Sequence, residues 1–331
     1  MRILLTHTRH MLANYYGAGP LAALRALADV RINDSDAVLE GAALAEAAKG
    51  CDIVLSDRQT PGPTPFFAAA PDVVAFMRCA VDVRNIDVDE ASRHGVLVTQ
   101  ATPGFTASVV ELGVGFMVDL ARGMTDYASD YRSGGEPDGQ MGRQLAGATV
   151  GVIGYGTLGK RFSEVARAIG MRVLVSDPHK TITDEGITQV DLPTLLSEAD
   201  FVVCLAIATE ETENLIDAAA FARMRPTSYF INLSRGNLVD EAALTAVLDA
   251  KGIAGAAIDV GRAPDQKPSL DLARRSDVIA APHVGGLTPE AISHQAYDTV
   301  AQVKALTEGH MPKGAVNPDA AERLARIGVA R

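Results

Sequence analysis

The stretch Gly154-Tyr155-Gly156-Thr157-Leu158-Gly159 decides the fold that this sequence predicts. It follows the apolar run 149–153, which has the length of a buried strand, and it precedes the helix-like stretch 160–169. A strand, a tight glycine turn and a helix in this order form the phosphate-binding unit of a dinucleotide fold. The first glycine allows the turn, the second lets the backbone approach a pyrophosphate, and the third lets the helix pack closely on the sheet.

An acidic residue stands where such a site needs one. Asp177 directly follows the next apolar run, 171–176, and lies eighteen residues beyond Gly159. A carboxylate at this position accepts hydrogen bonds from the adenosine ribose and repels a 2′-phosphate, so the sequence predicts NAD as the cofactor rather than NADP. His179 and Lys180 follow closely and could soften that preference.

Short apolar runs and helix-like runs alternate along most of the chain. Residues 1–100 contain several such runs, at 3–6, 21–28, 53–56, 73–77 and 96–99. The long apolar helix expected at 107–122 precedes a polar, glycine-rich stretch at 133–143. We read this region as a crossing into a second domain, because the alternation resumes at Thr149. The strands expected from there on are 149–153, 173–176, 201–207, 229–233, 255–260 and 278–281.

The predicted fold class is therefore α/β, with two Rossmann-like domains that each contain a parallel sheet. The chain returns to its first domain through the last long helix, expected at 289–308, so the outer domain is discontinuous. The expected bounds are 1–103 with 286–331 for the outer, substrate-binding domain and 104–285 for the dinucleotide-binding domain.

Composition narrows the class of protein further. The net charge of −11 and the pI near 5.1 argue against nucleic acid or an anionic membrane as the main partner. The apolar runs are far shorter than the ~20 residues of a membrane span, and the N-terminus turns polar too early for a signal peptide, so we expect a cytoplasmic protein. Cys51, Cys79 and Cys204 are scattered and the histidines lack metal-binding spacing, which predicts buried thiols and no metal.

Four motifs in a fixed order carry a family resemblance. They are Gly154 to Gly159 with Asp177, Asn232-Leu233-Ser234-Arg235-Gly236, Gly255-Ala256-Ala257-Ile258-Asp259-Val260 and Pro282-His283-Val284-Gly285-Gly286. With these motifs the chain resembles the D-isomer-specific 2-hydroxyacid dehydrogenases. The resemblance implies an NAD-dependent enzyme that transfers a hydride between nicotinamide and C2 of a small D-2-hydroxy acid or 2-keto acid. It also implies a homodimer held largely through the helix near residues 106–122.

Reduction of a 2-keto acid requires a carboxylate clamp and a proton donor, and two residues fit these needs. Arg235 follows the predicted strand 229–233, and its planar fork suits a carboxylate. The resemblance implies that Arg235 is the catalytic substrate arginine and that His283 is the general acid and base, which suits a side chain that titrates near neutrality. The cofactor-binding positions that it implies are Tyr155, Gly156, Thr157, Leu158, Asp177, Ile207, Thr209, Ser234, Asp259 and Ser108.

The segment after Asp259 departs from the family pattern. The family usually reads D-V-F-E-x-E-P and pairs its last glutamate with the histidine, whereas this chain is one residue shorter and has Ala263 in that place. Without a carboxylate partner, protonated His283 should be scarcer at neutral pH. Our hypothesis is that Asp265 reaches back as a substitute partner; a solvated loop aspartate is the alternative.

The expected substrate loop, 80–87, also departs from the pattern because two glycines are missing. The resemblance implies that Val81 and Asp82 inherit the role of binding the substrate carboxylate, although the charge of Asp82 disfavours anions. Arg78 and Arg84 could offset that charge. Arg78 matches a phosphate-binding residue of phosphoglycerate dehydrogenases, and an exposed structural arginine is the alternative. We expect weak selection for a second anionic group.

Two other functions remain open at this point. One is a phosphoglycerate dehydrogenase or a hydroxypyruvate/glyoxylate reductase, which differs only in substrate. The other is an NADH-sensing binding protein with little turnover, because a fold does not by itself imply catalysis. Turnover of a 2-keto acid separates the enzyme from the sensor.

Overall fold

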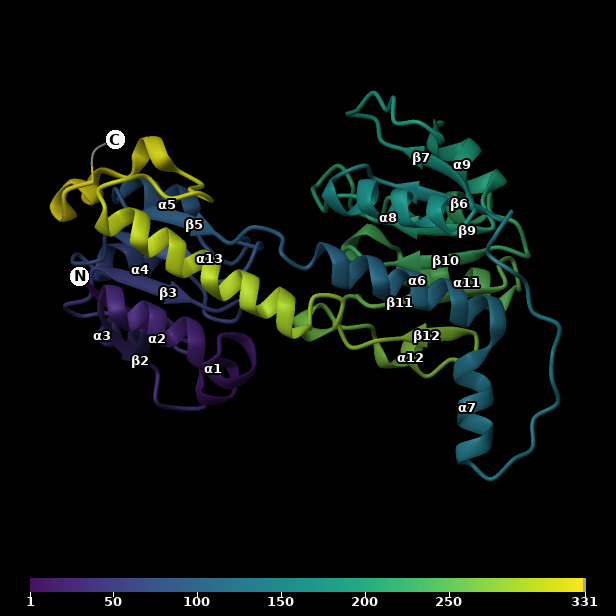
Figure 1. Cartoon of the computed structure of the whole chain (residues 1–331), viewed down its shortest axis with the longest axis horizontal. Coiled ribbons are helices and arrows are strands. Elements are labelled where there is room, and N and C mark those ends of the chain that lie inside the picture. The colour runs from purple at the N-terminus through teal and green to yellow at the C-terminus, as the bar shows by residue number, and fades with distance from the viewer. Residues whose placement is uncertain (330–331) are drawn as a thin grey trace. The chain divides into compact units, whose positions relative to one another are not determined.

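The computed structural model describes residues 1–329 and divides the chain into two compact units (Figure 1). One unit comprises Met1–Gly104 with Pro289–Arg331, and the other comprises Phe105–Thr288. The chain therefore passes from one unit to the other at Gly104 and returns at Pro289. The polar stretch 133–143 lies inside the second unit and is not the crossing that its composition indicated.

The discontinuous unit is built on a five-stranded parallel sheet with the order β2-β1-β3-β4-β5. Successive residues of β1 enter different cores, since Ile3 and Leu5 belong to one apolar cluster and Leu4 to another, as strand alternation requires. Helices α2 and α13 pack against each other. The elements are β1 (Arg2–Leu5), α1 (Arg9–Tyr15), α2 (Ala18–Leu27), β2 (Asp29–Ile32), α3 (Gly41–Ala47), β3 (Ile53–Ser56), α4 (Thr64–Ala69), β4 (Ala75–Arg78), α5 (Val88–Arg93), β5 (Leu97–Gln100), α13 (Pro289–Thr307) and the 3-10 helices η3 (Pro318–Ala320) and η4 (Glu322–Ile327).

The continuous unit contains a seven-stranded parallel sheet with the order β12-β11-β10-β9-β6-β7-β8. Strand order reverses between β6 and β9, and in such sheets a ligand binds outside the carboxyl ends of the strands at that switch point. The elements are α6 (Thr106–Arg122), α7 (Met124–Arg132), β6 (Thr149–Ile153), α8 (Thr157–Ala168), β7 (Arg172–Ser176), β8 (Ile187–Gln189), α9 (Leu192–Glu198), β9 (Phe201–Cys204), α10 (Ala218–Phe221), β10 (Tyr229–Asn232), η1 (Gly236–Leu238), α11 (Glu241–Asp249), β11 (Gly255–Ile258), η2 (Pro264–Gln266), α12 (Leu270–Ala273) and β12 (Val278–Ala280).

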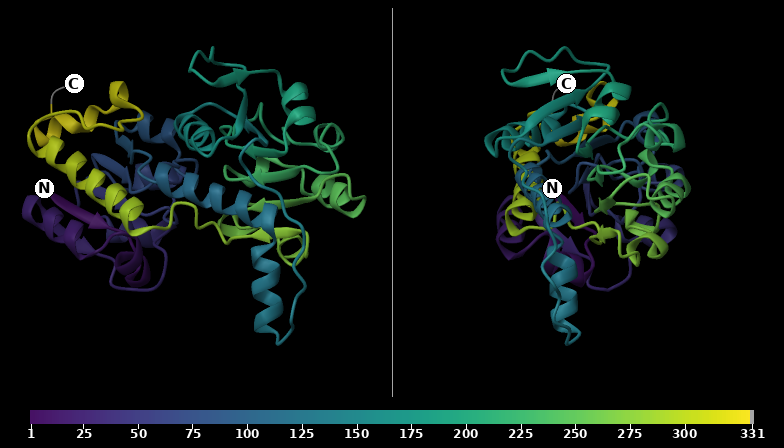
Figure 2. Two further views of the ribbon diagram at one scale, coloured as in Figure 1. Left: turned by 45° about the vertical axis from the view of Figure 1, so that its right-hand side comes forward. Right: turned by 90° about the vertical axis from the view of Figure 1, so that its right-hand side faces the viewer.

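The α/β fold with parallel sheets is confirmed, and the element bounds differ from the expected ones at a few places. Strand β9 stops at Cys204 instead of continuing to residue 207, and Ile207 is 77% exposed, because the chain has left the sheet and entered a turn. Strands β2 and β8 were not expected, since their charged and polar residues give little apolar signal. Helix α7 has no buried residue, and both views of Figure 2 show it projecting from the sheet of its unit.

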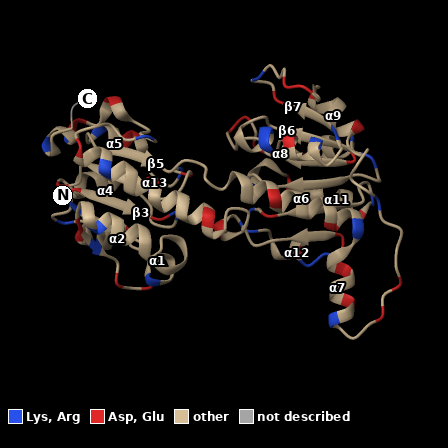
Figure 3. Ribbon diagram, viewed as in Figure 1, with Lys and Arg blue, Asp and Glu red and all other residues tan. Residues whose placement is uncertain are grey.

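Charged residues lie mainly outside the sheets, and the cysteines are buried. Figure 3 shows acidic and basic residues mainly on helices and loops, whereas the central strands carry few. All three cysteines are buried thiols, and burial raises the pKa of Cys79 and of Cys204 to about 12. Within residues 1–329, no helix combines the length and apolar character that crossing a membrane requires.

Candidate functional site

The glycine turn after β6 has the geometry that dinucleotide binding requires. Gly154 has a φ of +91°, and a Cβ there would lie 2.6 Å from the Cα of Ala206. A Cβ on Gly159 would lie 2.0 Å from the carbonyl oxygen of Gly154, so only glycine lets α8 start this close to the turn. No atom lies within 4 Å of a Cβ built on Gly156, which leaves the backbone before α8 open to a phosphate.

The carboxylate of Asp177 lies next to this turn. Its oxygens accept hydrogen bonds from the main-chain N–H groups of Tyr155, at 2.8 Å, and His179, at 2.9 Å. Lys180 donates to the carbonyl oxygen of Tyr155 at 2.7 Å, and the Tyr155 hydroxyl donates to Asp184 at 3.0 Å. Asp177 is therefore fixed at the end of β7, where the ribose of a dinucleotide would meet it, and these residues fit NAD.

The other predicted cofactor positions lie on several segments of the same unit. Ile207 and Thr209 belong to the turn after β9, which the hydroxyl of Thr212 holds through bonds to the Ile207 carbonyl and the Thr209 N–H. Thr157 and Leu158 are in the first turn of α8. The hydroxyl of Ser108 in α6 lies 2.7 Å from that of Thr288.

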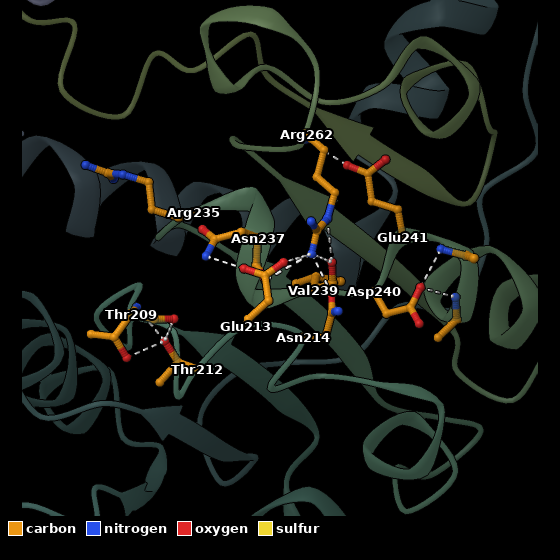
Figure 4. A network of polar contacts seen from close by, with 12 residues as sticks. Thr209, Thr212, Glu213, Asn214, Arg235, Asn237, Val239, Asp240, Glu241 and Arg262 are labelled. Carbon is orange, nitrogen blue, oxygen red and sulfur yellow. Dashed lines mark hydrogen bonds and ion pairs between the residues drawn. The ribbon is translucent and has the colours of Figure 1, made fainter. Parts of the chain in front are cut away.

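The side chain of Asn232 organises the turn that carries Arg235. Its Oδ1 accepts from the N–H of Ser234 at 3.1 Å, and its Nδ2 donates to the carbonyl oxygen of Arg235 at 3.0 Å. Asn232 is 1% exposed, and the Ser234 hydroxyl donates to the carbonyl oxygen of Ala206 at 2.5 Å. In Figure 4 the Arg235 side chain extends away from the polar network formed by its neighbours.

His283 follows β12 and is held from two sides. Asp259, at the end of β11, accepts from the N–H groups of Val284 and Gly285 at 2.8 Å each. Burial raises the pKa of the Asp259 carboxyl, while these hydrogen bonds and the nearby His283 oppose the rise. The Nδ1 atom of His283 lies 2.9 Å from the main-chain carbonyl oxygen of Asp265.

The hypothesis for Asp265 needs a correction in its chemistry. Asp265 does lie next to His283, but the atom in contact with the ring is its main-chain oxygen and not its carboxylate. The physical reason is the left-handed backbone of Asp265, with φ +60°, in the short segment 263–267. A neutral carbonyl orients an imidazole without supplying the negative charge of a carboxylate.

The predicted substrate loop lies in the discontinuous unit. Arg84 pairs with Asp82 through two contacts, from Nη2 to Oδ2 at 2.6 Å and from Nε to Oδ1 at 3.0 Å. The charge of Asp82 is thus offset by Arg84, as the sequence suggested. Val81 precedes this pair and is half-buried.

Arg78 is fully buried, so the alternative of an exposed structural arginine is wrong. It is the last residue of β4 and donates to the carbonyl oxygen of Thr60 and to the side chain of Asn85. Its Nε and Nη1 atoms have no hydrogen-bond partner within the described chain. Burial lowers the Arg78 pKa to about 10, and the charge of Asp57 partly offsets that effect.

The residues of the continuous unit share one edge of its sheet. The turn at Gly154 follows β6, Asp177 follows β7 and Arg235 follows β10. Asp259 follows β11 and His283 follows β12. Because all seven strands are parallel, these residues lie at the carboxyl edge, where a dinucleotide and its substrate bind in such folds.

Two residues that organise the candidate site escaped the sequence interpretation. Asn232 stands in the quoted motif, and a buried polar residue ending a strand is a signal that could have found it. Arg262 anchors the loop between Asp259 and Asp265. Its hydrogen-bond partners come from distant segments, so no local sequence pattern predicts this role. Within the described residues, no group of three or more His, Cys, Asp or Glu side chains is arranged to hold a metal ion.

Comparison with known proteins agrees with this geometry. Residues 114–285 match the family model described as D-isomer specific 2-hydroxyacid dehydrogenase, NAD binding domain. The chain belongs to this family. It is accordingly an NAD-dependent oxidoreductase of the 2-hydroxyacid dehydrogenase class.

Individual relatives support the assignment. A D-3-phosphoglycerate dehydrogenase from Synechocystis is 37% identical over 75% of this chain, but the match spans only 46% of that relative. A glyoxylate reductase from Korarchaeum cryptofilum is 32% identical over 83% of this chain and 85% of its own length. Among solved structures, the TT0316 protein from Thermus thermophilus has a TM-score of 0.86 at 25% identity, covering 96% of this chain and all of that one.

Proposed function

We propose that the enzyme reduces a small 2-keto acid to the D-2-hydroxy acid, or catalyses the reverse reaction, with Arg235 and His283 as its catalytic residues. The observation that carries this proposal is their common position at the carboxyl edge of the sheet whose glycine turn fits NAD. Bound NADH would supply the hydride. Arg235 would bind the substrate carboxylate and the adjoining ketone oxygen, since its fork matches two acceptors.

His283 would deliver the proton that the ketone oxygen takes up. Its Nδ1 faces the Asp265 carbonyl, so Nε2 is the atom left for the substrate. The imidazolium form donates from Nε2 during reduction, and the neutral form accepts at Nε2 during oxidation. Asp259 would keep the 283–285 backbone in place and would contact the nicotinamide end of the cofactor. The other cofactor residues would be those predicted from the sequence.

We further propose that the discontinuous unit supplies the substrate loop. We also propose that the preferred substrate carries a single negative charge, in place of the weak selection for a second anionic group that the sequence predicted. Arg84 is paired with Asp82, and Arg78 is fully buried, so neither guanidinium is free to bind a second anionic group. Relatives named glyoxylate reductase and hydroxypyruvate reductase make glyoxylate and hydroxypyruvate the first compounds to test. A phosphorylated substrate, as in the relative named D-3-phosphoglycerate dehydrogenase, would require Arg78 to become accessible.

The test is NADH oxidation by the purified protein with glyoxylate, hydroxypyruvate, pyruvate, phenylpyruvate and 3-phosphohydroxypyruvate. Arg235→Ala serves as the inactive control, and NADH binding to both proteins is measured by fluorescence. We expect turnover with a monoanionic keto acid that the substitution lowers by at least ~100-fold without loss of NADH binding. Tight NADH binding with no turnover on any compound would contradict the proposal and favour a sensing role.

We also propose that the enzyme is a cytoplasmic homodimer whose subunits meet along α6 and α7. These two helices and the loop that follows them carry exposed apolar side chains, with Val118 40%, Met124 56% and Tyr131 65% exposed and Met141 fully exposed. Large apolar side chains left exposed on neighbouring elements support an interface here. Sedimentation equilibrium of the wild type and of Met124→Glu should show a dimer and a monomer, respectively. Fractionation of the source cells tests the location.

A further inference from the structure

The contact between His283 and Asp265 has only one chemical interpretation. A carbonyl oxygen accepts hydrogen bonds and cannot donate them, so the Nδ1 atom at 2.9 Å must carry the proton. In the neutral ring the lone pair is then on Nε2. This single contact selects one of the two tautomers of His283.

The carbonyl is presented by a tightly closed loop, which we call the 259–268 loop. Main-chain hydrogen bonds join the Gly261 N–H to the Gln266 oxygen at 2.9 Å and the Ala263 N–H to the Lys267 oxygen at 3.1 Å. Asp265 and Gln266 have φ values of +60° and +55°. Such backbone is unfavourable for residues other than glycine and persists only where the surroundings enforce it.

Arg262 holds this strained backbone in place through its hydrogen bonds (Figure 4). Its N–H donates to Oε1 of Glu241 at 2.9 Å, and its Nη2 donates to the carbonyl oxygens of Asn237 at 3.0 Å and Val239 at 3.2 Å. Nη2 also bonds to the side chain of Asn214 and pairs with Glu213 at 2.9 Å. Two of these five acceptors are main-chain carbonyl oxygens, so the anchor does not depend on the exposed ion pair with Glu213 alone.

A close backbone contact completes the attachment. A Cβ on Gly236 would lie 2.1 Å from the carbonyl carbon of Gly261, so the loop rests directly on the residue that follows Arg235. The loop that contacts the His283 ring therefore also packs directly against the segment that carries Arg235. On the other side, Asp259 at the start of the loop holds the N–H groups that follow His283.

We propose that the main-chain carbonyl of Asp265, held by the 259–268 loop and anchored by Arg262, fixes the tautomer and orientation of His283. Asp265 and Arg262 are then positioning residues, because they act through the histidine. The expected effect of these residues on catalysis rests on the proposed role of His283 as acid and base. The tautomer of His283 does not depend on that proposed role.

The tautomer can be read directly by NMR. The full-length protein is labelled with ¹⁵N-histidine, and a long-range ¹H–¹⁵N spectrum at pH 8.5 distinguishes the protonated from the unprotonated ring nitrogen. The chain has seven histidines, and His283→Gln assigns the relevant signals. We expect the Nδ1–H form in the wild type and, unchanged, in Asp265→Asn, because the substitution keeps the main-chain carbonyl. An Nε2–H form in the wild type, or a switch of tautomer in Asp265→Asn, would overturn the proposal.

A second pair of variants tests the anchor. Arg262→Met should mix the two tautomers and lower kcat at least about tenfold while leaving the dissociation constant of NADH unchanged. The matched control is Arg172→Met, which removes an exposed pair with Glu198 elsewhere in the same unit. An Arg262→Met protein that keeps both the tautomer and kcat would refute the anchoring role. The Nδ1–H form in a protein without turnover would instead refute the proposed function and leave the orientation intact.

Discussion

The Nδ2 atom of Asn232 donates a hydrogen bond of 3.0 Å to the carbonyl oxygen of Arg235, three residues further along the chain. The opposite end of the same amide accepts from Ser234, so one buried side chain closes the turn that projects Arg235 from the end of β10. The catalytic role proposed for Arg235 therefore depends on a residue that need not touch the substrate.

Substitution of Asn232 by alanine should uncouple binding from catalysis. Loss of two hydrogen bonds in a buried turn is expected to cost about 1–3 kcal/mol of stability and to release Arg235 from its position. We predict that kcat/KM for the keto acid falls by ~10–100-fold, whereas the affinity for NADH changes little. Steady-state kinetics and NADH fluorescence measure the two effects. Equal losses in both would show that Asn232 supports the whole sheet edge and not Arg235 in particular.

Asp177 should set the preference for NADH. Asp177→Ser removes the charged acceptor for the ribose, so we predict a ~10–100-fold weaker affinity for NADH, corresponding to about 1.5–3 kcal/mol. The affinity for NADPH should rise, because repulsion of the 2′-phosphate disappears. Calorimetric titration with both cofactors measures the change, and Glu185→Gln removes a charge from the same region as a control. A variant that still discriminates against NADPH as strongly as the wild type would argue against this role.

Removal of Arg84 should weaken the neutralisation of the Asp82 charge. In Arg84→Ala the carboxylate of Asp82 loses the guanidinium that lies 2.6 Å away. Its negative charge then repels an incoming anion more strongly. We predict a several-fold rise in KM for keto acids, larger for dianionic than for monoanionic ones, with little change in kcat. Asp82→Asn/Arg84→Ala should restore KM. If the double variant behaves like the single one, Arg84 acts on the substrate itself and not through Asp82.

His7 should make the protein sensitive to acid. Burial lowers its pKa to about 4 from the ordinary 6.5; Asp57 opposes this shift and Arg78 adds to it. Between these values the unfolded chain binds a proton that the folded one does not, so the contribution of His7 to stability is lost as the pH falls from 6.5 toward 4. The full loss amounts to about 3 kcal/mol.

Urea unfolding at pH 7 and pH 4.5 measures this effect. The difference between the two pH values should be smaller in His7→Gln than in the wild type. His10→Gln, which changes an exposed histidine three residues away, should behave like the wild type. An unchanged pH dependence in His7→Gln would mean that His7 is protonated in the folded protein or that carboxylates alone govern acid unfolding.

Local sequence patterns predicted the parts of the site whose positions depend on spacing along the chain. Gly154 and Gly159 are required by contacts with adjacent backbone, and Asp177 is placed by the length of the intervening helix and strand, so spacing alone locates them. Arg235 and His283 were located because each follows a strand that apolar residues make visible.

Contacts between distant segments were beyond the reach of the sequence. The anchor of Arg262 depends on residues near 213, 237 and 241, which only the folded sheet edge brings together. The contact of Asp265 with His283 through its carbonyl depends on two left-handed residues that are not glycine, so no composition signal marks it. The burial of Arg78 follows from its position as the last residue of β4, whereas the apolar run that marks this strand ends one residue earlier.

The most direct test of the central claim follows the hydride itself. Keto acid is incubated with NADH deuterated at either the 4R or the 4S position, and the product is examined by mass spectrometry. We predict that one of the two cofactors delivers a single deuterium to C2 of a D-2-hydroxy acid, and that this transfer is lost in Arg235→Ala and in His283→Gln. A product that carries no deuterium from either cofactor, or transfer that persists in both variants, would contradict the account.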